Sequence, residues 1–377
     1  MFSQSEVEQY RRHLSLEGFG QPAQEKLARS SVLVIGAGGL GCPALQYLTA
    51  AGVGKIGIID DDLVELSNLQ RQILFTHEDV GKPKAEVASQ ALSKLNPHIK
   101  IISYRERFSQ KNAERLLDEY QMVLDGTDNF SSRYLINDAC VLFNTVLIHG
   151  SINRFEGMVS VFNFQNGPTY RCMFPDCPDP STVPTCAEAG VIGVLPGLIG
   201  CWQAWEAIKV LTGVGEPLSG KVLLYDSLSQ TMKKVALKPL PQSRQISSLP
   251  ELSPSCSRQN TMNPENKIEE LSIEELEQMM AMDTSLQILD VREDWERNLD
   301  KISPSHHIPL GNLMESVSQS YPIELSKEQN LVVYCKAGVR SRMACQALQT
   351  IGFKNLYNLS QGMDGWLHLH QSLSESE

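Results

Sequence analysis

The chain has 377 residues, too many for one ordinary hydrophobic core, and this length indicates two or three domains. Its net charge of −11 and the lack of any block of Lys or Arg lead us to expect no nucleic-acid surface. The N-terminus lacks an apolar signal core, and Pro196, Glu206 and Lys209 interrupt the most apolar stretch, so we expect no membrane span. Nine cysteines without a signal peptide predict reduced thiols and a cytoplasmic location.

Short apolar runs alternate with helical apolar spacing between residues 31 and 240. The expected strands are 31–35, 56–60, 99–103, 122–125, 146–149 and 159–164, and the expected helices are 40–51, 84–95, 111–120, 131–143 and 198–211. Strands that alternate with helices imply right-handed crossovers. The sequence therefore predicts an α/β domain with a Rossmann-like, mostly parallel sheet.

This alternation stops between residues 241 and 266, a stretch with six Ser and four Pro that we interpret as a linker. A second, smaller α/β pattern follows over residues 267–370. Its expected strands are 288–290 and 331–334, and its expected helix, 341–351, ends at Gly352. Residues 371–377 are interpreted as a tail.

A glycine-rich turn follows the first expected strand, in the sequence V-L-V-I-G-A-G-G-L-G-C-P. Gly36, Gly38, Gly39 and Gly41 would let backbone N–H groups approach a phosphate at a helix N-terminus. Asp60 ends the next strand and can accept hydrogen bonds from a ribose. By itself this pattern favours a dinucleotide enzyme, and the glycines would alternatively serve only helix–sheet packing.

Charged residues further along favour nucleotidyl transfer over hydride transfer. The segment from Asp60 to Asp62 leads into S-N-L-Q-R-Q, then Lys84 appears in G-K-P-K, and a later strand ends in D-G-T-D-N. Arg71 and Lys84 would neutralise a triphosphate, and Asp128 would hold Mg²⁺ near the leaving pyrophosphate. Alternatively, the two basic residues would lie on a solvated helix face.

These five motifs, in this order over residues 1–240, resemble the ThiF/MoeB family, the bacterial relatives of ubiquitin-activating enzymes. The resemblance implies ATP-dependent adenylation of the C-terminal glycine of a ubiquitin-like sulfur carrier, with ATP and Mg²⁺ as cofactors. It also implies a homodimer, in which Arg12 reaches into the partner's site, although the adjacent Arg11 would serve equally. The implied nucleotide-binding residues are Gly36, Gly38, Gly39, Gly41, Asp60, Asp62, Ser67, Asn68, Leu69, Gln70, Arg71, Lys84, Asp128 and Asn129, with Asp128 also binding the metal.

Relatives in this family carry a loop cysteine and a zinc site, and this sequence matches them to different extents. Cys186, in T-C-A-E-A-G-V, matches a loop cysteine that forms a thioester or takes part in acyl-disulfide exchange, and otherwise it would be an inert loop residue. Many relatives hold zinc with two CxxC pairs. Here Thr169 replaces the first thiol before Cys172, and only Cys256 lies near the domain's end. We therefore do not expect structural zinc.

The second domain carries a cysteine loop, C-K-A-G-V-R-S, between an expected strand and a helix. N–H groups at a helix N-terminus stabilise a thiolate or a persulfide at Cys335, and Gly338 permits the sharp turn. Together with D-V-R-E, H-I-P-L and G-M-D-G-W, the loop resembles a rhodanese domain. The resemblance implies that Cys335 carries sulfur and Arg340 fixes the loop. An inactive binding domain and a dual-specificity phosphatase, whose loop has one more residue, are the alternatives.

The combined prediction is an adenylyltransferase with sulfurtransferase activity that makes a thiocarboxylate on a MoaD-like or ThiS-like carrier. We expect a cysteine desulfurase to load Cys335. The molybdopterin route is preferred to the thiamine route because fusions of this layout are frequent on the MoeB branch. The rivals from other classes are an NAD-dependent oxidoreductase and a non-catalytic scaffold for a ubiquitin-like partner.

Overall fold

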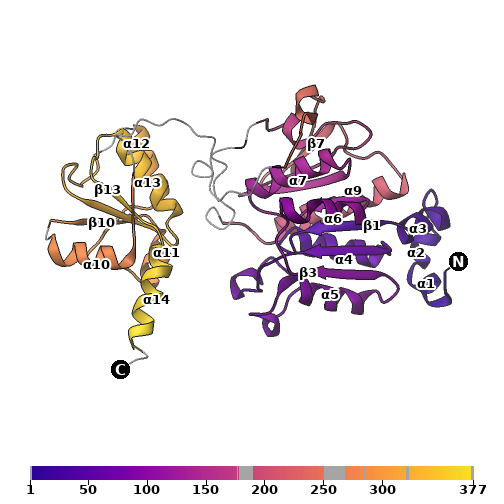
Figure 1. Ribbon diagram of the computed structural model, residues 1–377, viewed down its shortest axis with the longest axis horizontal. Coiled ribbons are helices and arrows are strands. Elements are labelled where there is room, and N and C mark those ends of the chain that lie inside the picture. The colour runs from indigo at the N-terminus through magenta and orange to yellow at the C-terminus, as the bar shows by residue number, and fades with distance from the viewer. Residues whose placement is uncertain are drawn as a thin grey trace. The chain divides into compact units, whose positions relative to one another are not determined.

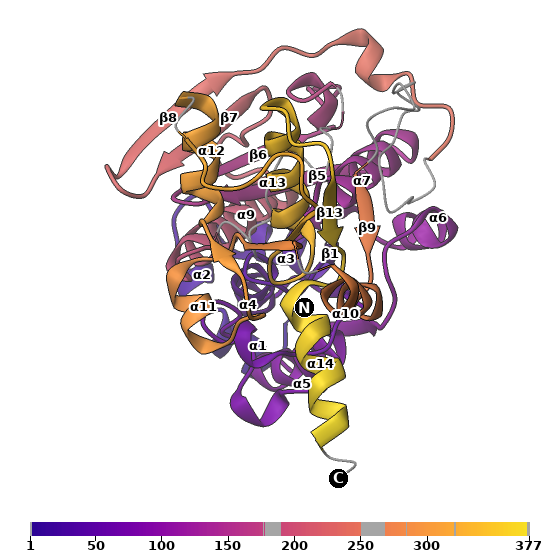
Figure 2. The same ribbon diagram turned by 90° about the vertical axis from the view of Figure 1, so that its left-hand side faces the viewer.

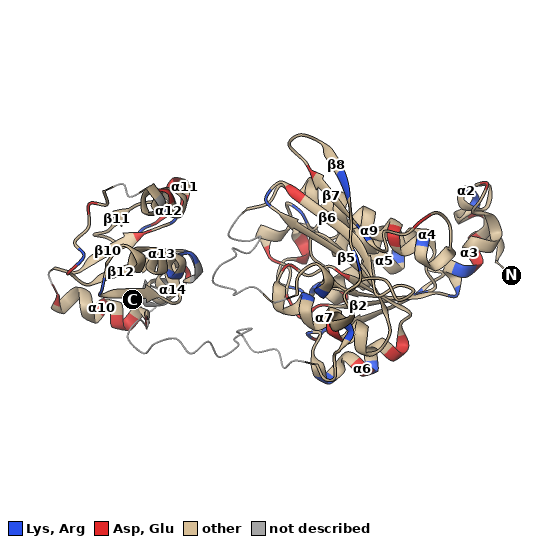
Figure 3. Ribbon diagram, turned by 90° about the horizontal axis from the view of Figure 1, so that it is seen from above, with Lys and Arg blue, Asp and Glu red and all other residues tan. Residues whose placement is uncertain are grey.

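A computed structural model describes residues 2–175, 177, 190–249, 268–283, 285–319 and 322–374. Within these ranges the chain forms two compact units, one containing the described residues up to 249 and the other those from 268 onward (Figure 1). Acidic and basic residues are interspersed along both ribbons (Figure 3). Among the described residues, no helix is long and apolar enough to cross a membrane.

The first unit is built on an eight-stranded sheet in the order β3-β2-β1-β4-β5-β6-β7-β8. The strands are β1 (Ser31–Ile35), β2 (Lys55–Ile59), β3 (Lys100–Tyr104), β4 (Met122–Asp125), β5 (Val146–Asn153), β6 (Glu156–Phe162), β7 (Lys221–Asp226) and β8 (Thr231–Ala236). Neighbours from β3 to β5 pair in parallel, and those from β5 to β8 pair antiparallel. The predicted α/β fold with a mostly parallel sheet is confirmed.

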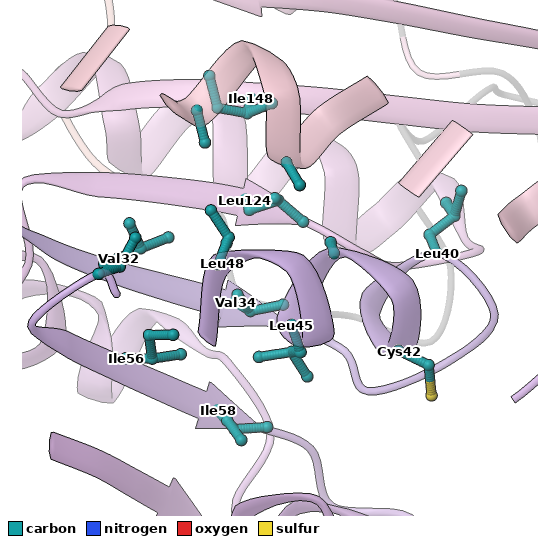
Figure 4. Packing of buried hydrophobic residues seen from close by; sticks show 14 of the residues in the cluster. Val32, Val34, Leu40, Cys42, Leu45, Leu48, Ile56, Ile58, Leu124 and Ile148 are labelled. Atoms are coloured by element: carbon teal, nitrogen blue, oxygen red, sulfur yellow. The ribbon is translucent and has the colours of Figure 1, made fainter. Parts of the chain in front are cut away.

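Helices cover both faces of this sheet because successive side chains of a strand point to opposite sides. In β1, Val32 and Val34 pack toward α4 (Gly41–Ala51), α5 (Lys84–Leu95) and α9 (Val194–Thr212). Leu33 and Ile35 pack toward α6 (Gln110–Glu119) and α7 (Phe130–Leu142). Figure 4 shows α4 lying over β1 and β2 through Leu45 and Leu48. Three helices precede the sheet, α1 (Gln4–Gln9), α2 (Arg11–Leu14) and α3 (Gly20–Ala28).

Several features differ from the sequence prediction, and three of them concern the C-terminal part of the first unit. The hairpin of β7 and β8 was not expected, since every residue of β8 is exposed and the strand carries no apolar run. The strand β6 begins three residues earlier than expected and runs antiparallel to β5. Helix α9 begins at Val194 rather than at residue 198, because Pro196 lies in its first turn, where no backbone N–H is required.

The second unit has a five-stranded, fully parallel sheet in the order β11-β10-β12-β13-β9. Its strands are β9 (Glu269–Leu271), β10 (Gln287–Asp290), β11 (His306–His307), β12 (Leu331–Tyr334) and β13 (Leu356–Leu359). One face packs against α12 (Leu310–Gln319) and α13 (Val339–Thr350). The other packs against α10 (Ile273–Met282) and α14 (Gly362–Ser374), which lie side by side (Figure 2). A further short helix, α11 (Asp294–Leu299), follows β10.

The expected linker is described only from residue 241 to 249. This part contains the short turn η4 (Pro241–Arg244), and the side chains of Ser243 and Leu249 are buried against the first unit. Arg244 donates hydrogen bonds to the side chain of Asn163 and to the carbonyl of Gly167. These nine residues therefore pack on the first unit rather than standing apart from it.

Candidate functional site

A cavity of about 340 Å³ opens in the first unit beyond the carboxyl ends of β1, β2 and β4. Open α/β sheets place their ligands at this edge. The cavity brings together nine of the predicted binding residues, namely Gly36, Gly38, Gly39, Asp60, Asp62, Arg71, Lys84, Asp128 and Asn129. Residues far apart in the sequence thus share one polar pocket.

The glycine turn is shaped by contacts that leave no room for side chains. Gly36 has φ +93°, and a Cβ there would lie 2.9 Å from the carbonyl oxygen of Gly126. A Cβ on Gly41 would lie 2.0 Å from the carbonyl oxygen of Gly36. Gly41 does not line the cavity. Its lack of a side chain allows α4 to begin directly against the turn.

Asp60 ties this turn to the end of β2. One carboxylate oxygen accepts the backbone N–H of Ala37 at 2.7 Å, and the other accepts that of Asp62 at 2.9 Å. Burial raises the pKa of the Asp60 carboxyl, an effect that the positive charge of Lys84 partly offsets. The carboxylate therefore holds the turn open while it faces the cavity.

Lys84 is the first residue of α5, and its side chain is only 7% exposed. Its ammonium nitrogen lies 2.8 Å from a carboxylate oxygen of Asp62, whose side chain is 67% exposed. Arg71 donates a hydrogen bond to the carbonyl of Ser67 at 3.1 Å. Both cations line the cavity, and the carboxylate that pairs with Lys84 is free to move into solvent.

The loop after β4 carries Asp128 and is fixed from below by a buried carboxylate. One oxygen of Asp125 accepts the N–H and the hydroxyl of Thr127, at 2.9 and 2.7 Å. The other lies 2.8 Å from Nδ1 of His149. Burial alone would raise the pKa of Asp125, but the hydrogen bond and charge of His149 hold it below its usual value. Asp128 itself is exposed at the cavity.

Several predicted residues lie outside this lining. Ser67 and Asn68 belong to the short turn η1 (Leu66–Asn68), where Asn68 accepts a hydrogen bond from the backbone of Glu65, and Leu69 and Gln70 follow directly. Arg12 is exposed on α2. Cys186 and Cys256 lie outside the described residues.

Sequence reasoning did not assign several further lining residues, among them Gln72, Arg107, Phe108, Thr127, Ser132 and Arg133. Arg107 and Phe108 follow β3, so their position beyond the carboxyl end of a parallel strand was an available signal. The carboxylates of Asp60, Asp61 and Asp62 lie within 4.8 Å of one another, and all three residues line the same cavity.

In the second unit, Cys335 follows β12 and is 1% exposed. The hydroxyl of Ser341 lies 3.4 Å from its sulfur and donates to the side chain of Asn358 at 2.6 Å. Gly338, at φ +86°, starts α13, and a Cβ there would lie 2.1 Å from the carbonyl oxygen of Ser360. The loop therefore closes tightly around a single sulfur atom.

Arg340 closes this loop through an ion pair that the sequence did not predict. Its guanidinium binds both carboxylate oxygens of Glu296 on α11, at 2.6 and 2.7 Å. Burial opposes the ionised carboxylate, but the hydrogen bonds from Arg340 hold the pKa of Glu296 below its usual value. Arg340 thus ties the segment after Cys335 to α11, and its role in fixing the loop stays a prediction.

The pattern that defines the ThiF family matches residues 10–245, and the pattern of the rhodanese-like domain matches residues 272–369. The chain belongs to the ThiF family. This ThiF chain is 38% identical to the probable adenylyltransferase/sulfurtransferase MoeZ of Mycobacterium tuberculosis over 97% of its own length and 93% of that protein. It is 37% identical to the adenylyltransferase and sulfurtransferase MOCS3-1 of Zea mays, over 96% of its length and 81% of that protein.

A third relative matches a smaller share of the chain. The sulfur carrier protein adenylyltransferase of Thermus thermophilus is 48% identical over 64% of this chain and 91% of its own length. Among solved structures, Escherichia coli MccB with MccA-N7isoASN has a TM-score of 0.56 at 22% identity, over 64% of this chain and 74% of that one, which supports the fold. The predicted enzyme class, an adenylyltransferase joined to a rhodanese sulfurtransferase, is confirmed.

Proposed function

We propose that the first unit adenylates the C-terminal glycine of a ubiquitin-like sulfur carrier with ATP and that Cys335 then supplies sulfur to form a thiocarboxylate. One observation carries this proposal. Two cations, Arg71 and Lys84, and the carboxylate of Asp128 line the same cavity as the glycine turn. A nicotinamide cofactor has no triphosphate tail that needs such a set of charges.

In the adenylation step, the turn at Gly36–Gly39 faces the phosphates and Asp60 accepts hydrogen bonds from the ribose. A carboxylate oxygen of the carrier attacks the α-phosphorus, the bond between the α- and β-phosphates breaks, and pyrophosphate leaves. Arg71 and Lys84 stabilise the charge on that leaving group. Asp128 would hold Mg²⁺, which supplies further charge neutralisation when bound.

In the sulfur step, a cysteine desulfurase loads Cys335 as a persulfide. The terminal sulfur attacks the acyl carbon and AMP leaves, so the carrier is joined to Cys335 through an acyl disulfide. A thiol then attacks the Cys335 sulfur and releases the thiocarboxylate, with a disulfide left for a cellular reductant. We assign that thiol to Cys186.

Exposed apolar side chains beside the cavity support a protein substrate. Phe155, Leu228 and Met232 are 44%, 73% and 57% exposed on the turns that follow β5 and β7 and at the start of β8. The backbone N–H of Ser227 donates to the carbonyl of Phe155, which joins the two turns. Ile152, just before them, lines the cavity. We propose this surface as the place where the body of the carrier docks while its tail enters the cavity.

A homodimer is the second proposed assembly. A hollow of about 600 Å³ lies between α4 and α9, lined by the exposed side chains of Tyr47, Ile73 and Val194, and it shares Arg71 with the nucleotide cavity. Exposed apolar surface of this kind is typical of protein interfaces. Arg12 of the second copy would complete the site. We propose a cytoplasmic location and, for the pathway, molybdopterin synthesis, with the thiamine route as the alternative.

The test is ATP–pyrophosphate exchange with purified Gly-Gly-ended carriers. Asp128→Ala should abolish exchange, whereas Asp118→Ala, which removes an exposed acid of α6, should leave it unchanged. Cys335→Ala should retain exchange and form no thiocarboxylate, with Cys201→Ala as its control. Carrier binding without AMP formation would identify a scaffold, and tight NADH binding without ATP binding would identify an oxidoreductase. Comparing MoaD-like with ThiS-like carriers decides the pathway.

A further inference from the structure

Two short turns, distant in sequence, meet at the sulfur of Cys172. In each turn the backbone N–H of the fourth residue donates to the carbonyl of the first, from Cys172 to Thr169 and from Ser243 to Leu240, both at 3.0 Å. The turns are η3 (Tyr170–Cys172) and η4. Four positions with repeated three-residue spacing thus converge, the arrangement in which two CxxC pairs hold zinc.

The side chains at these positions do not fit a zinc ion. Structural zinc takes four thiolate or imidazole ligands. Here Cys172 is the one thiol, Thr169 and Ser243 offer neutral hydroxyls, and Leu240 offers only its backbone. The sequence identified the first half of this arrangement, but Leu240 and Ser243 could not be recognised as its second half because neither is a metal ligand.

Hydrogen bonds occupy the place of the metal. The sulfur of Cys172 accepts the backbone N–H groups of Thr169 and Leu240, both at 3.3 Å. The hydroxyls of Ser243 and Thr169 lie 3.1 and 3.6 Å from it. Thr169, Cys172 and Ser243 are all buried. Burial opposes ionisation, but these hydrogen bonds hold the pKa of the Cys172 thiol below its usual value.

We propose that the Cys172 sulfur and its hydrogen-bond donors are a metal-free clip, which fastens the end of the first unit where other chains of the family use zinc. The clip joins η4 to the segment that carries Tyr170. That segment is held in turn by a hydrogen bond from the Tyr170 N–H to Asn137 and by the ion pair of Arg171 with Asp138 on α7. Residues 240–249 are thereby held on the first unit without any ion, independently of the proposed reaction.

The metal content of the purified full-length chain tests whether the clip works without zinc. We expect far less than about one zinc per chain and a melting temperature that a strong chelator does not change. Stoichiometric zinc, or melting that a chelator lowers, would overturn the clip. A variant with Thr169→Cys, Leu240→Cys and Ser243→Cys should bind about one zinc per chain and melt in a chelator-dependent way. If this variant folds but binds no metal, the four positions do not form the proposed geometry.

Removal of the sulfur tests the fastening itself. Cys172→Ala should lower the melting temperature of the first unit by about 5 °C, since the N–H groups of Thr169 and Leu240 lose their acceptor. It should also speed proteolytic cleavage within residues 240–249 by about tenfold, the ratio that a loss of about 1.4 kcal/mol in local stability produces. Cys201→Ala, at a half-buried thiol for which no such donors are seen, is the matched control. Equal melting and cleavage of the two variants would contradict the fastening role.

Discussion

The cavity of the first unit and the cysteine loop of the second both follow a parallel strand and lead into a helix, yet they differ in size and in the origin of their charges. The cavity holds about 340 Å³ and takes its charged side chains from several separate segments. The Cys335 loop surrounds one cysteine that is 1% exposed, and the hydroxyl of Ser341, six residues further along the same segment, contacts its sulfur. A strand–turn–helix unit sets only the position of a ligand, and the surrounding side chains determine whether a triphosphate or a sulfur fits.

The largest expected effect is on the rate of pyrophosphate exchange, which depends on the charged side chains that line the cavity of the first unit. Lys84→Met should slow carrier-dependent pyrophosphate exchange at least about 100-fold, because the charge on the leaving group loses a buried counter-ion. Lys82→Met is the control, since Lys82 makes only an exposed ion pair with Asp79 at 3.3 Å. Exchange rates at saturating ATP measure the effect. Similar rates for both variants would remove Lys84 from the proposed mechanism.

The ion pair between Arg340 and Glu296 should contribute mainly to the stability of the second unit. Glu296→Ala leaves the guanidinium of Arg340 without its carboxylate in a site where both side chains are about nine-tenths buried. We expect the second unit to lose about 3–5 kcal/mol in denaturant unfolding. Glu277→Ala, which removes an exposed partner of His370, should cost less than about 1 kcal/mol. A cost as small for Glu296→Ala would mean that the loop is fixed by its backbone alone.

Alanine substitutions at two glycines separate the effect of a tight contact in the Cys335 loop from the effect of a positive φ alone. Gly338 and Gly352 have φ of +86° and +96°, but a Cβ on Gly338 would lie 2.1 Å from the Ser360 carbonyl, whereas on Gly352 it would meet only the end of Lys327 at 4.0 Å. Gly352→Ala should cost about 1–2 kcal/mol in denaturant unfolding and keep the thiocarboxylate-forming activity. Gly338→Ala should cost more and remove that activity. If both variants lose the same free energy of unfolding, the tight contact at Gly338 does not contribute to closing the loop.

The smallest expected effect is the acid response that one buried carboxylate gives the second unit. The Asp290 carboxyl of the second unit is buried, and hydrogen bonds from Arg292 and Tyr334 hold its pKa below the usual value. Its contribution is therefore complete above the unfolded pKa near about 4 and is lost as the pH falls further. In the first unit, the pKa of the Asp125 carboxyl is likewise held below its usual value, whereas that of Asp60 shifts the opposite way. Asp290→Asn should flatten the pH dependence of unfolding of the second unit below about pH 4; an unchanged slope would assign the acid response to other groups.

The sequence predicted those parts of the molecule that depend on local pattern. Helix 84–95 and strands 122–125 and 331–334 have the predicted bounds, because apolar periodicity and the flanking turns determine them. The glycine turn and Asp128 could be placed at the cavity since parallel strands all end at the same edge.

Contacts between distant segments could not be predicted in this way. Glu296 pairs with Arg340 across 44 positions, and Ser243 meets Cys172 across 71, and neither spacing leaves a periodic signal. Strand β8 was missed because its place at the exposed edge of the sheet demands no apolar residues. The sequence likewise contains no signal that the carboxylate of Asp125 is buried and holds the loop that carries Asp128.

The start of α14 forms the floor of the Cys335 loop. The N–H groups of Met363 and Asp364 donate to the carbonyls of Cys335 and Lys336, at 2.8 and 3.0 Å, and a Cβ on Gly362 would lie 2.4 Å from the Lys336 oxygen. The length of the Cys335 loop and the position of α14 are therefore coupled, so an insertion that lengthens the loop would also alter the backbone contacts at the start of this helix.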